Sequence, residues 1–152
     1  MSSKQYAKGY RLERAAQKEL EGLGWHVERR FMSKGGIGED LVAWVPGWED
    51  GAIMYVQCKA DSRKKAGKEP KQGMMCPKEW NRFRNNVVDG DYCILANGTP
   101  AHIKWHEITG LRKEGLVGRA AANDISEHMR DFTPIDVHQW WDEIAEEMER
   151  GE

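Results

Sequence analysis

The segment YVQCKA, Tyr55 to Ala60, places two long polar side chains inside a run of residues that favours a buried strand. Residues two positions apart on a strand point to the same face. Gln57 and Lys59 are therefore expected to project together from one side. Burying such side chains without partners is costly, so this pair indicates a site at which polar groups perform chemistry.

Asp40 is expected to join this pair through an antiparallel hairpin. Residues 40–45 and 52–60 both favour strands, and the turn signal PGWEDG lies between them. If Val45 pairs with Ala52 across this turn, the residue numbers of any two opposite positions add up to 97, and Asp40 lies opposite Gln57. Directly paired side chains have Cβ atoms about 5 Å apart. A slip of one residue would separate the two side chains.

Glu13 is a carboxylate on the apolar stripe of a predicted helix over residues 3–23. It follows Leu12 and shares a stripe with Ala16 and Leu20, because seven residues make nearly two helical turns. Buried carboxylates are rare unless they are paired, hydrogen-bonded or bound to a metal. The helix therefore brings a second carboxylate toward the sheet.

The predicted catalytic set consists of Glu13, Asp40, Gln57 and Lys59, and the first three of these are the predicted metal ligands. Two carboxylates and an amide oxygen are the ligands that suit Mg²⁺, and Mn²⁺ is expected to substitute for it. An ammonium such as that of Lys59 can orient water or stabilise charge developing on a phosphate. A bound metal can generate the nucleophile for phosphodiester cleavage.

Each residue also has a plain structural interpretation. Glu13 could be a helix-surface acid, Asp40 a turn residue, and Lys59 a solubilising residue at a strand end. The conjunction of all four is harder to dismiss than any one of them, but spacing alone leaves both interpretations open.

The elements predicted along the 152 residues form one mixed α/β domain, 1–152. A basic, mobile loop is expected at about 61–73. In chain order the helices and strands are expected at 3–23 (helix), 25–31, 40–45 and 52–60 (strands), 77–87 (helix), 91–98 and 101–108 (strands), and 136–149 (acidic helix).

The formal net charge of -2 conceals two opposite halves. Residues 59–84 contain nine Lys and Arg against three Asp and Glu, whereas residues 131–152 contain one against eight. The basic part could bind a polyanion, or it could be a solvated charged loop.

The sequence favours an intracellular, cytoplasmic and soluble protein. It contains no run of about 18 apolar residues, and its N-terminus lacks the apolar stretch of a signal peptide. Three isolated cysteines without CxxC spacing indicate a reduced protein rather than a disulfide framework or a zinc site.

One stretch of the chain resembles the D-(X)n-(D/E)-X-K signature of the PD-(D/E)XK nuclease superfamily. It consists of GEDLVAW, then the predicted hairpin turn, then YVQCKA. The preceding KGYRLERAAQKELEGLGWHVERR resembles the opening of archaeal-type Holliday junction resolvases, with a Lys-Gly and a Glu-Arg on the first helix and a strand ending in Arg. The resemblance covers residues 8–108 in order of elements. It implies a restriction-endonuclease-like mixed central sheet flanked by helices, and a homodimer that cuts four-way DNA junctions with Mg²⁺ or Mn²⁺.

Carried over to this chain, the resemblance places Glu13, Asp40, Gln57 and Lys59 on the acidic and lysine positions of the family's active site. Arginines that bind junction DNA in the family correspond to Arg14 and Arg29. Loop lysines can contact phosphates without reading bases. The predicted DNA-binding residues are Lys8, Arg14, Arg29, Arg30, Lys34, Arg63, Lys64 and Lys65.

Two positions depart from the family pattern. Gln57 stands where the family usually has Glu, which keeps an oxygen ligand but removes a charge. Glu39 precedes Asp40 where many members have Pro or an apolar residue, and it is a reserve ligand only. Two alternatives therefore stay open: another nuclease of the superfamily acting in restriction or repair, or a junction-binding protein in which Gln57 has removed catalysis.

Overall fold

The structure is a computed structural model that describes residues 3–30, 40–47, 51, 53–62, 66–67, 73–75, 77–87, 91–108 and 132–150.

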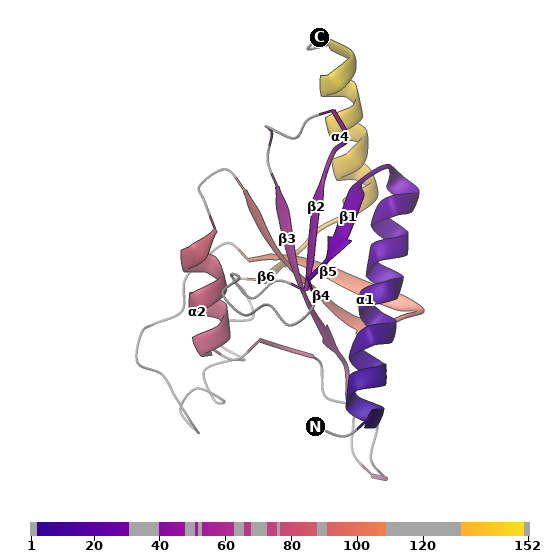
Figure 1. The fold of residues 1–152 in the computed structure, drawn as a ribbon, viewed down its shortest axis with the longest axis vertical. Helices are drawn as coiled ribbons and strands as arrows, with labels where there is room; N and C mark the ends of the chain where they lie inside the picture. The colour runs from indigo at the N-terminus through magenta and orange to yellow at the C-terminus, as the bar shows by residue number, and fades with distance from the viewer. Residues whose placement is uncertain are drawn as a thin grey trace.

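A mixed sheet of six strands runs through the centre of the molecule (Figure 1). The strands are ordered as in the chain, and neighbours are antiparallel except for the parallel pair β3–β4. Helix α2 (Pro77–Asn86) lies in the crossover that this parallel pair requires. The strands are β1 (His26–Arg29), β2 (Leu41–Trp44), β3 (Met54–Ala60), β4 (Tyr92–Thr99), β5 (His102–Ile108) and β6 (Phe132–Pro134).

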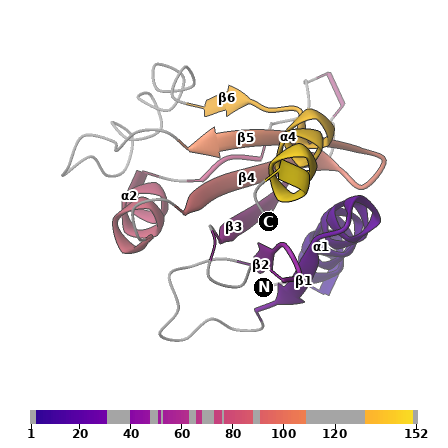
Figure 2. The ribbon, with the colours of Figure 1, turned by 90° about the horizontal axis from the view of Figure 1, so that it is seen from above.

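Helices cover both faces of this sheet, as the view in Figure 2 shows. Helix α1 (Ser3–Leu23) and helix α4 (Val137–Arg150) pack on one face, in a core that includes Val56 and Cys58 of β3. Helix α2 packs on the other face with Leu95 and the half-buried Tyr55. The sheet is therefore the middle of three layers, and alternate residues of β3 face opposite helices.

The predicted hairpin register is confirmed. Strands β2 and β3 pair Leu41 with Val56 and Ala43 with Met54, so opposite positions sum to 97. The pairing continues one step beyond the strand, where the backbone N–H of Asp40 donates to the carbonyl of Val56 at 2.8 Å. In this register Asp40 lies opposite Gln57, on the strand face that Gln57 shares with Lys59.

Helix α1 ends where the sequence predicts it to end. Gly24 has a φ of 108°, and the N–H groups of Gly24 and Trp25 donate to the carbonyls of Glu21 and Leu20, which is the Schellman arrangement. A Cβ on Gly24 would also lie 2.6 Å from the ring of Trp141. Glycine is needed here both for its backbone conformation and for the close packing of α4.

Several boundaries differ from the predicted ones. The first strand is shorter than 25–31, and β6 forms over the segment FTP, for which no strand was predicted. The acidic helix was placed correctly, with Asp136 Oδ1 accepting from the N–H groups of His138 and Gln139 as its cap. Among the helices of the described residues, none combines the length and apolar character needed to cross a bilayer.

Candidate active site

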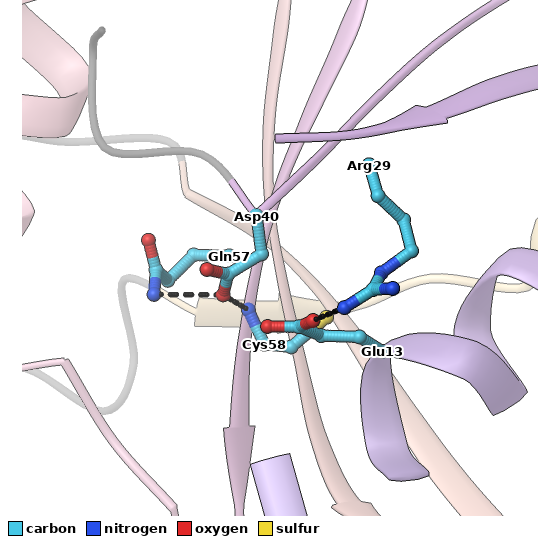
Figure 3. A network of polar contacts seen from close by, with 5 residues as sticks. All are labelled: Glu13, Arg29, Asp40, Gln57 and Cys58. Carbon is cyan, nitrogen blue, oxygen red and sulfur yellow. Dashed lines mark hydrogen bonds and ion pairs between the residues drawn. The ribbon is translucent and has the colours of Figure 1, made fainter. Parts of the chain in front are cut away.

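Asp40 immediately precedes β2 and is held in place by two hydrogen bonds. Its Oδ2 accepts from Gln57 Nε2 at 3.0 Å and from the backbone N–H of Cys58 at 2.8 Å (Figure 3). Burial raises the pKa of Asp40 to about 6, although the hydrogen bond from Cys58 opposes this shift. The predicted meeting of Asp40 and Gln57 is therefore confirmed, and the carboxylate is desolvated.

Glu13 reaches the same place from α1. Its Oε2 accepts from Arg29 Nη2 at 2.9 Å, and both side chains are largely buried, with 22% and 17% exposure. Figure 3 shows the carboxylate of Glu13 extending toward Asp40. The charge of Glu13 adds to the raised pKa of Asp40. Two carboxylates thus face each other across the end of β3.

Gln57 is 9% exposed and directs its amide nitrogen, not its oxygen, at Asp40. Its Oε1 points away from that carboxylate in Figure 3. Rotation about the Cγ–Cδ bond exchanges the two amide atoms. Gln57 can therefore serve as a donor to Asp40 in this arrangement and as an oxygen ligand after rotation.

Lys59 lies on the same face of β3 as Gln57, and its Nζ donates to Glu79 Oε2 at 2.8 Å. Both charges act on Asp40, since Lys59 lowers its pKa and Glu79 raises it. Glu79 was not predicted as a site residue. It stands in the first turn of α2, where acidic residues are ordinary because of the helix dipole, so no sequence signal distinguished it.

Cys58 contributes to the site through its backbone only. Its side chain points to the opposite face, into the core that α1 covers. Burial raises the pKa of its thiol well above the usual value, so a thiolate nucleophile is not formed there near neutral pH.

The end of β3 is fixed by a polar clamp on the α2 side, formed by Asp61, Gly73, Asn97 and His106. Gly73 donates its N–H to Asp61 Oδ1 and accepts from Asn97 Nδ2, both at 2.8 Å. His106 Nε2 lies 3.0 Å from Asn97 Oδ1. A Cβ on Gly73 would lie 2.1 Å from the carbonyl oxygen of Lys59, so only glycine fits against this strand end.

The predicted DNA-binding residues separate into three groups. Arg14 and Arg30 are exposed, and the guanidinium of Arg14 lies 5.9 Å from the ring centroid of Tyr10. Arg29 is mostly committed to Glu13 and also lies over Tyr10, at 4.5 Å. The third group lies outside the described part of the structure. The backbone of Lys8 belongs to α1, but its side chain is not described. The residues that are not described at all are Lys34, Arg63, Lys64 and Lys65, together with the reserve ligand Glu39.

The donor set fits a hard divalent cation. Asp40 and Glu13 would supply carboxylate oxygens to such a cation, whose positive charge would offset the desolvation and the repulsion from Glu13 that raise the pKa of Asp40. No group of three or more His, Cys, Asp and Glu side chains placed for a metal occurs within the described ranges. Any further donor to such a cation would be Gln57 Oε1, a backbone carbonyl or water, and Mg²⁺ commonly retains several waters.

No protein-family model matches the chain, and no curated protein does.

Proposed function

We propose that this protein is a metal-dependent, structure-specific DNA endonuclease that cleaves four-way junctions. The observation that carries the proposal is the buried carboxylate of Asp40, hydrogen-bonded by Gln57 and Cys58 and facing Glu13. Lys59 stands two residues after Gln57 on the same strand face. This is a set of groups suited to hydrolysis of a phosphodiester.

The order of elements supports a restriction-endonuclease-like fold, as the resemblance implies. Helix α1 precedes an antiparallel β1-β2-β3 unit, and α2 connects β3 to the parallel β4. The candidate residues come from the helix, from the start of β2 and from the end of β3, so they converge at one edge of this unit.

In the proposed mechanism, Mg²⁺ or Mn²⁺ would be held by Asp40, Glu13 and Gln57. When bound, the metal supplies Lewis-acid activation of water and charge stabilisation. Asp40 must be ionised to act as a ligand, and its hydrogen bond from Cys58 favours the ionised form. Arg29 fixes the orientation of Glu13, and Lys59 provides an ammonium for the phosphate or the attacking water.

Junction DNA is the proposed substrate because the resemblance to archaeal-type resolvases spans residues 8–108. Exposed Arg14 and Arg30, together with the basic segment that follows β3, offer phosphate contacts that carry no base information. A homodimer would supply two active sites for the two symmetric cuts.

One observation favours the alternative of a binding protein without catalysis. Gln57 donates its amide N–H to Asp40 and supplies no charge, so metal affinity is reduced relative to a site with Glu at this position. That alternative predicts salt-sensitive junction binding without cleavage.

The experiment incubates purified protein with a labelled four-way junction, a matched linear duplex and a single strand, each with Mg²⁺ or Mn²⁺. Selective cutting of the junction supports the proposal. Equal cutting of all three substrates would replace it with a nuclease of other specificity, and tight junction binding without any product would favour the non-catalytic alternative.

A further inference from the structure

The negative charge that position 57 lacks is matched by a carboxylate on α2. Glu79 lies in the first turn of that helix, and its Oε2 accepts from Lys59 Nζ at 2.8 Å. The same carboxylate contributes to the raised pKa of Asp40. Glu79 therefore interacts with two members of the candidate site. It forms an ion pair with Lys59, and its negative charge acts electrostatically on Asp40.

The charge of the site depends on this residue. Glu13, Asp40, Arg29 and Lys59 sum to a formal charge of zero, and Glu79 makes it -1. A site with Glu in place of Gln57 and no Glu79 would also have -1. Because divalent cations are bound mainly through carboxylate charge, Glu79 restores the electrostatic balance that Gln57 removes.

Glu79 is presented by a rigid element rather than by a loose surface chain. Its neighbour Trp80 is fully buried and Phe83 is 1% exposed, so both fix α2 to the sheet. On the other side, the backbone of Lys59 is held in the sheet by its pairing with Asn97 of β4. The ion pair joins two anchored elements, although its own side chains are 29% and 44% exposed.

Ion pairs this exposed contribute little to stability. Their effect is instead on where the ammonium lies. Lys59 could otherwise turn toward Asp40, whose charge attracts it, and would then compete with a cation for that carboxylate. With Glu79 as its partner, Lys59 stands beside the metal ligands without neutralising them.

We propose that Glu79 is the positioning residue of this site, which holds Lys59 from α2 and supplies the carboxylate charge missing at position 57. This inference rests on the proposed function for its catalytic meaning, but its electrostatic content can be measured without DNA.

The test compares Glu79→Gln, Gln57→Glu and the double variant Gln57→Glu/Glu79→Gln with the wild type. The matched control is Glu147→Gln on the exposed face of α4. The dissociation constant for Mn²⁺ is measured by calorimetry on the full chain without DNA, the urea midpoint is recorded for each variant, and junction cleavage is measured in parallel.

Glu79→Gln is expected to weaken Mn²⁺ binding by about tenfold, the scale of losing a group that supports metal ligands. The double variant is expected to return to within about threefold of the wild type, because the charge is restored at position 57. The control should leave Mn²⁺ binding and cleavage unchanged. A rescue of this kind would not follow from a purely structural role of Glu79.

Unchanged Mn²⁺ binding in Glu79→Gln, or a double variant that binds Mn²⁺ as weakly as Glu79→Gln alone, would overturn the inference while leaving any cleavage by the wild type intact. Conversely, the expected Mn²⁺ pattern in a protein that cuts no DNA would support the inference and refute the nuclease proposal. Should Glu79→Gln lower the urea midpoint, Glu79→Asp keeps the charge and is expected to bind Mn²⁺ within about threefold of the wild type; a tenfold loss there would count against the inference.

Discussion

Replacing Asp40 with asparagine should make the metal-free protein more stable at neutral pH, even though it removes the carboxylate on which the proposed function depends. Asparagine preserves the shape of the side chain, and its oxygen can accept the hydrogen bonds from Gln57 and Cys58. What it removes is the charge. In the wild type that charge is desolvated and lies near the carboxylate of Glu13.

The magnitude follows from the pKa of Asp40, which rises from 3.8 to about 6 on folding. One pKa unit corresponds to about 1.36 kcal/mol, so ionised Asp40 costs up to about 3 kcal/mol. Because the folded state binds the proton more tightly, stability falls as pH rises. The cost is nearly absent below about pH 4, develops between about pH 4 and pH 6, and is complete above about pH 7.

The assay is urea unfolding of wild type and Asp40→Asn with a chelator at pH 4.5 and pH 7.5. The expected gain in unfolding free energy is about 1 kcal/mol at the lower pH and about 3 kcal/mol at the higher. The difference of about 2 kcal/mol between the two is the decisive quantity, since effects of asparagine on packing do not depend on pH. Asp142→Asn, on an exposed position of α4, is the matched control for the substitution itself.

Saturating Mn²⁺ should reverse the order of the two proteins at pH 7.5, because the metal binds the ionised wild-type carboxylate and stabilises only the folded state. If Asp40→Asn were destabilising by the same amount at both pH values, burial would not be penalising the charge of Asp40. That result would refute the electrostatic description of the site.

Three further perturbations are predicted to have distinct outcomes. Arg29→Ala should lower the free energy of unfolding, measured in urea, by about 1–3 kcal/mol, between the values for exposed and buried ion pairs. Adding Glu13→Gln to this variant should recover part of that loss. An undiminished loss would mean that Arg29 and Glu13 are not energetically coupled. Gly73→Ala should destabilise the folded protein by at least about 2 kcal/mol, because the new Cβ would meet the backbone of Lys59. The control is Gly9→Ala on α1, where a Cβ would meet nothing within 4 Å, and it should stabilise the protein by about 0.5–1 kcal/mol. Equal effects of the two substitutions in thermal or urea unfolding would contradict the role of Gly73 in the polar clamp. Lys59→Ala should abolish junction cleavage while leaving the urea midpoint nearly unchanged, and retained cleavage would remove Lys59 from the catalytic set.

The parts of the site that the sequence predicted are those set by periodicity and short-range pairing. A two-residue strand period placed Gln57 and Lys59 on one face, and the turn length fixed the hairpin register that brings Asp40 to Gln57. The helical period likewise placed Glu13 beside the apolar stripe of α1. These relations depend on local geometry that any strand or helix obeys.

The parts that could not be predicted depend on how distant elements pack. The approach of α2 to β3, which pairs Glu79 with Lys59, follows from burial of Trp80 and Phe83 and leaves no signature near Glu79 itself. The clamp at Gly73 is equally non-local, because Asn97 reaches it from β4. Sequence spacing contains no information about such contacts until the strand order is known.

The most direct test of the proposed nuclease activity is cleavage of one labelled four-way junction by wild type and Asp40→Asn, side by side with Mg²⁺ and with Mn²⁺ at pH 7.5. We expect paired symmetric nicks from the wild type and none from Asp40→Asn, although the variant is the more stable protein when metal is absent and still binds the junction. Equal cleavage by the two proteins, or no cleavage by the wild type with either metal, would contradict the proposal.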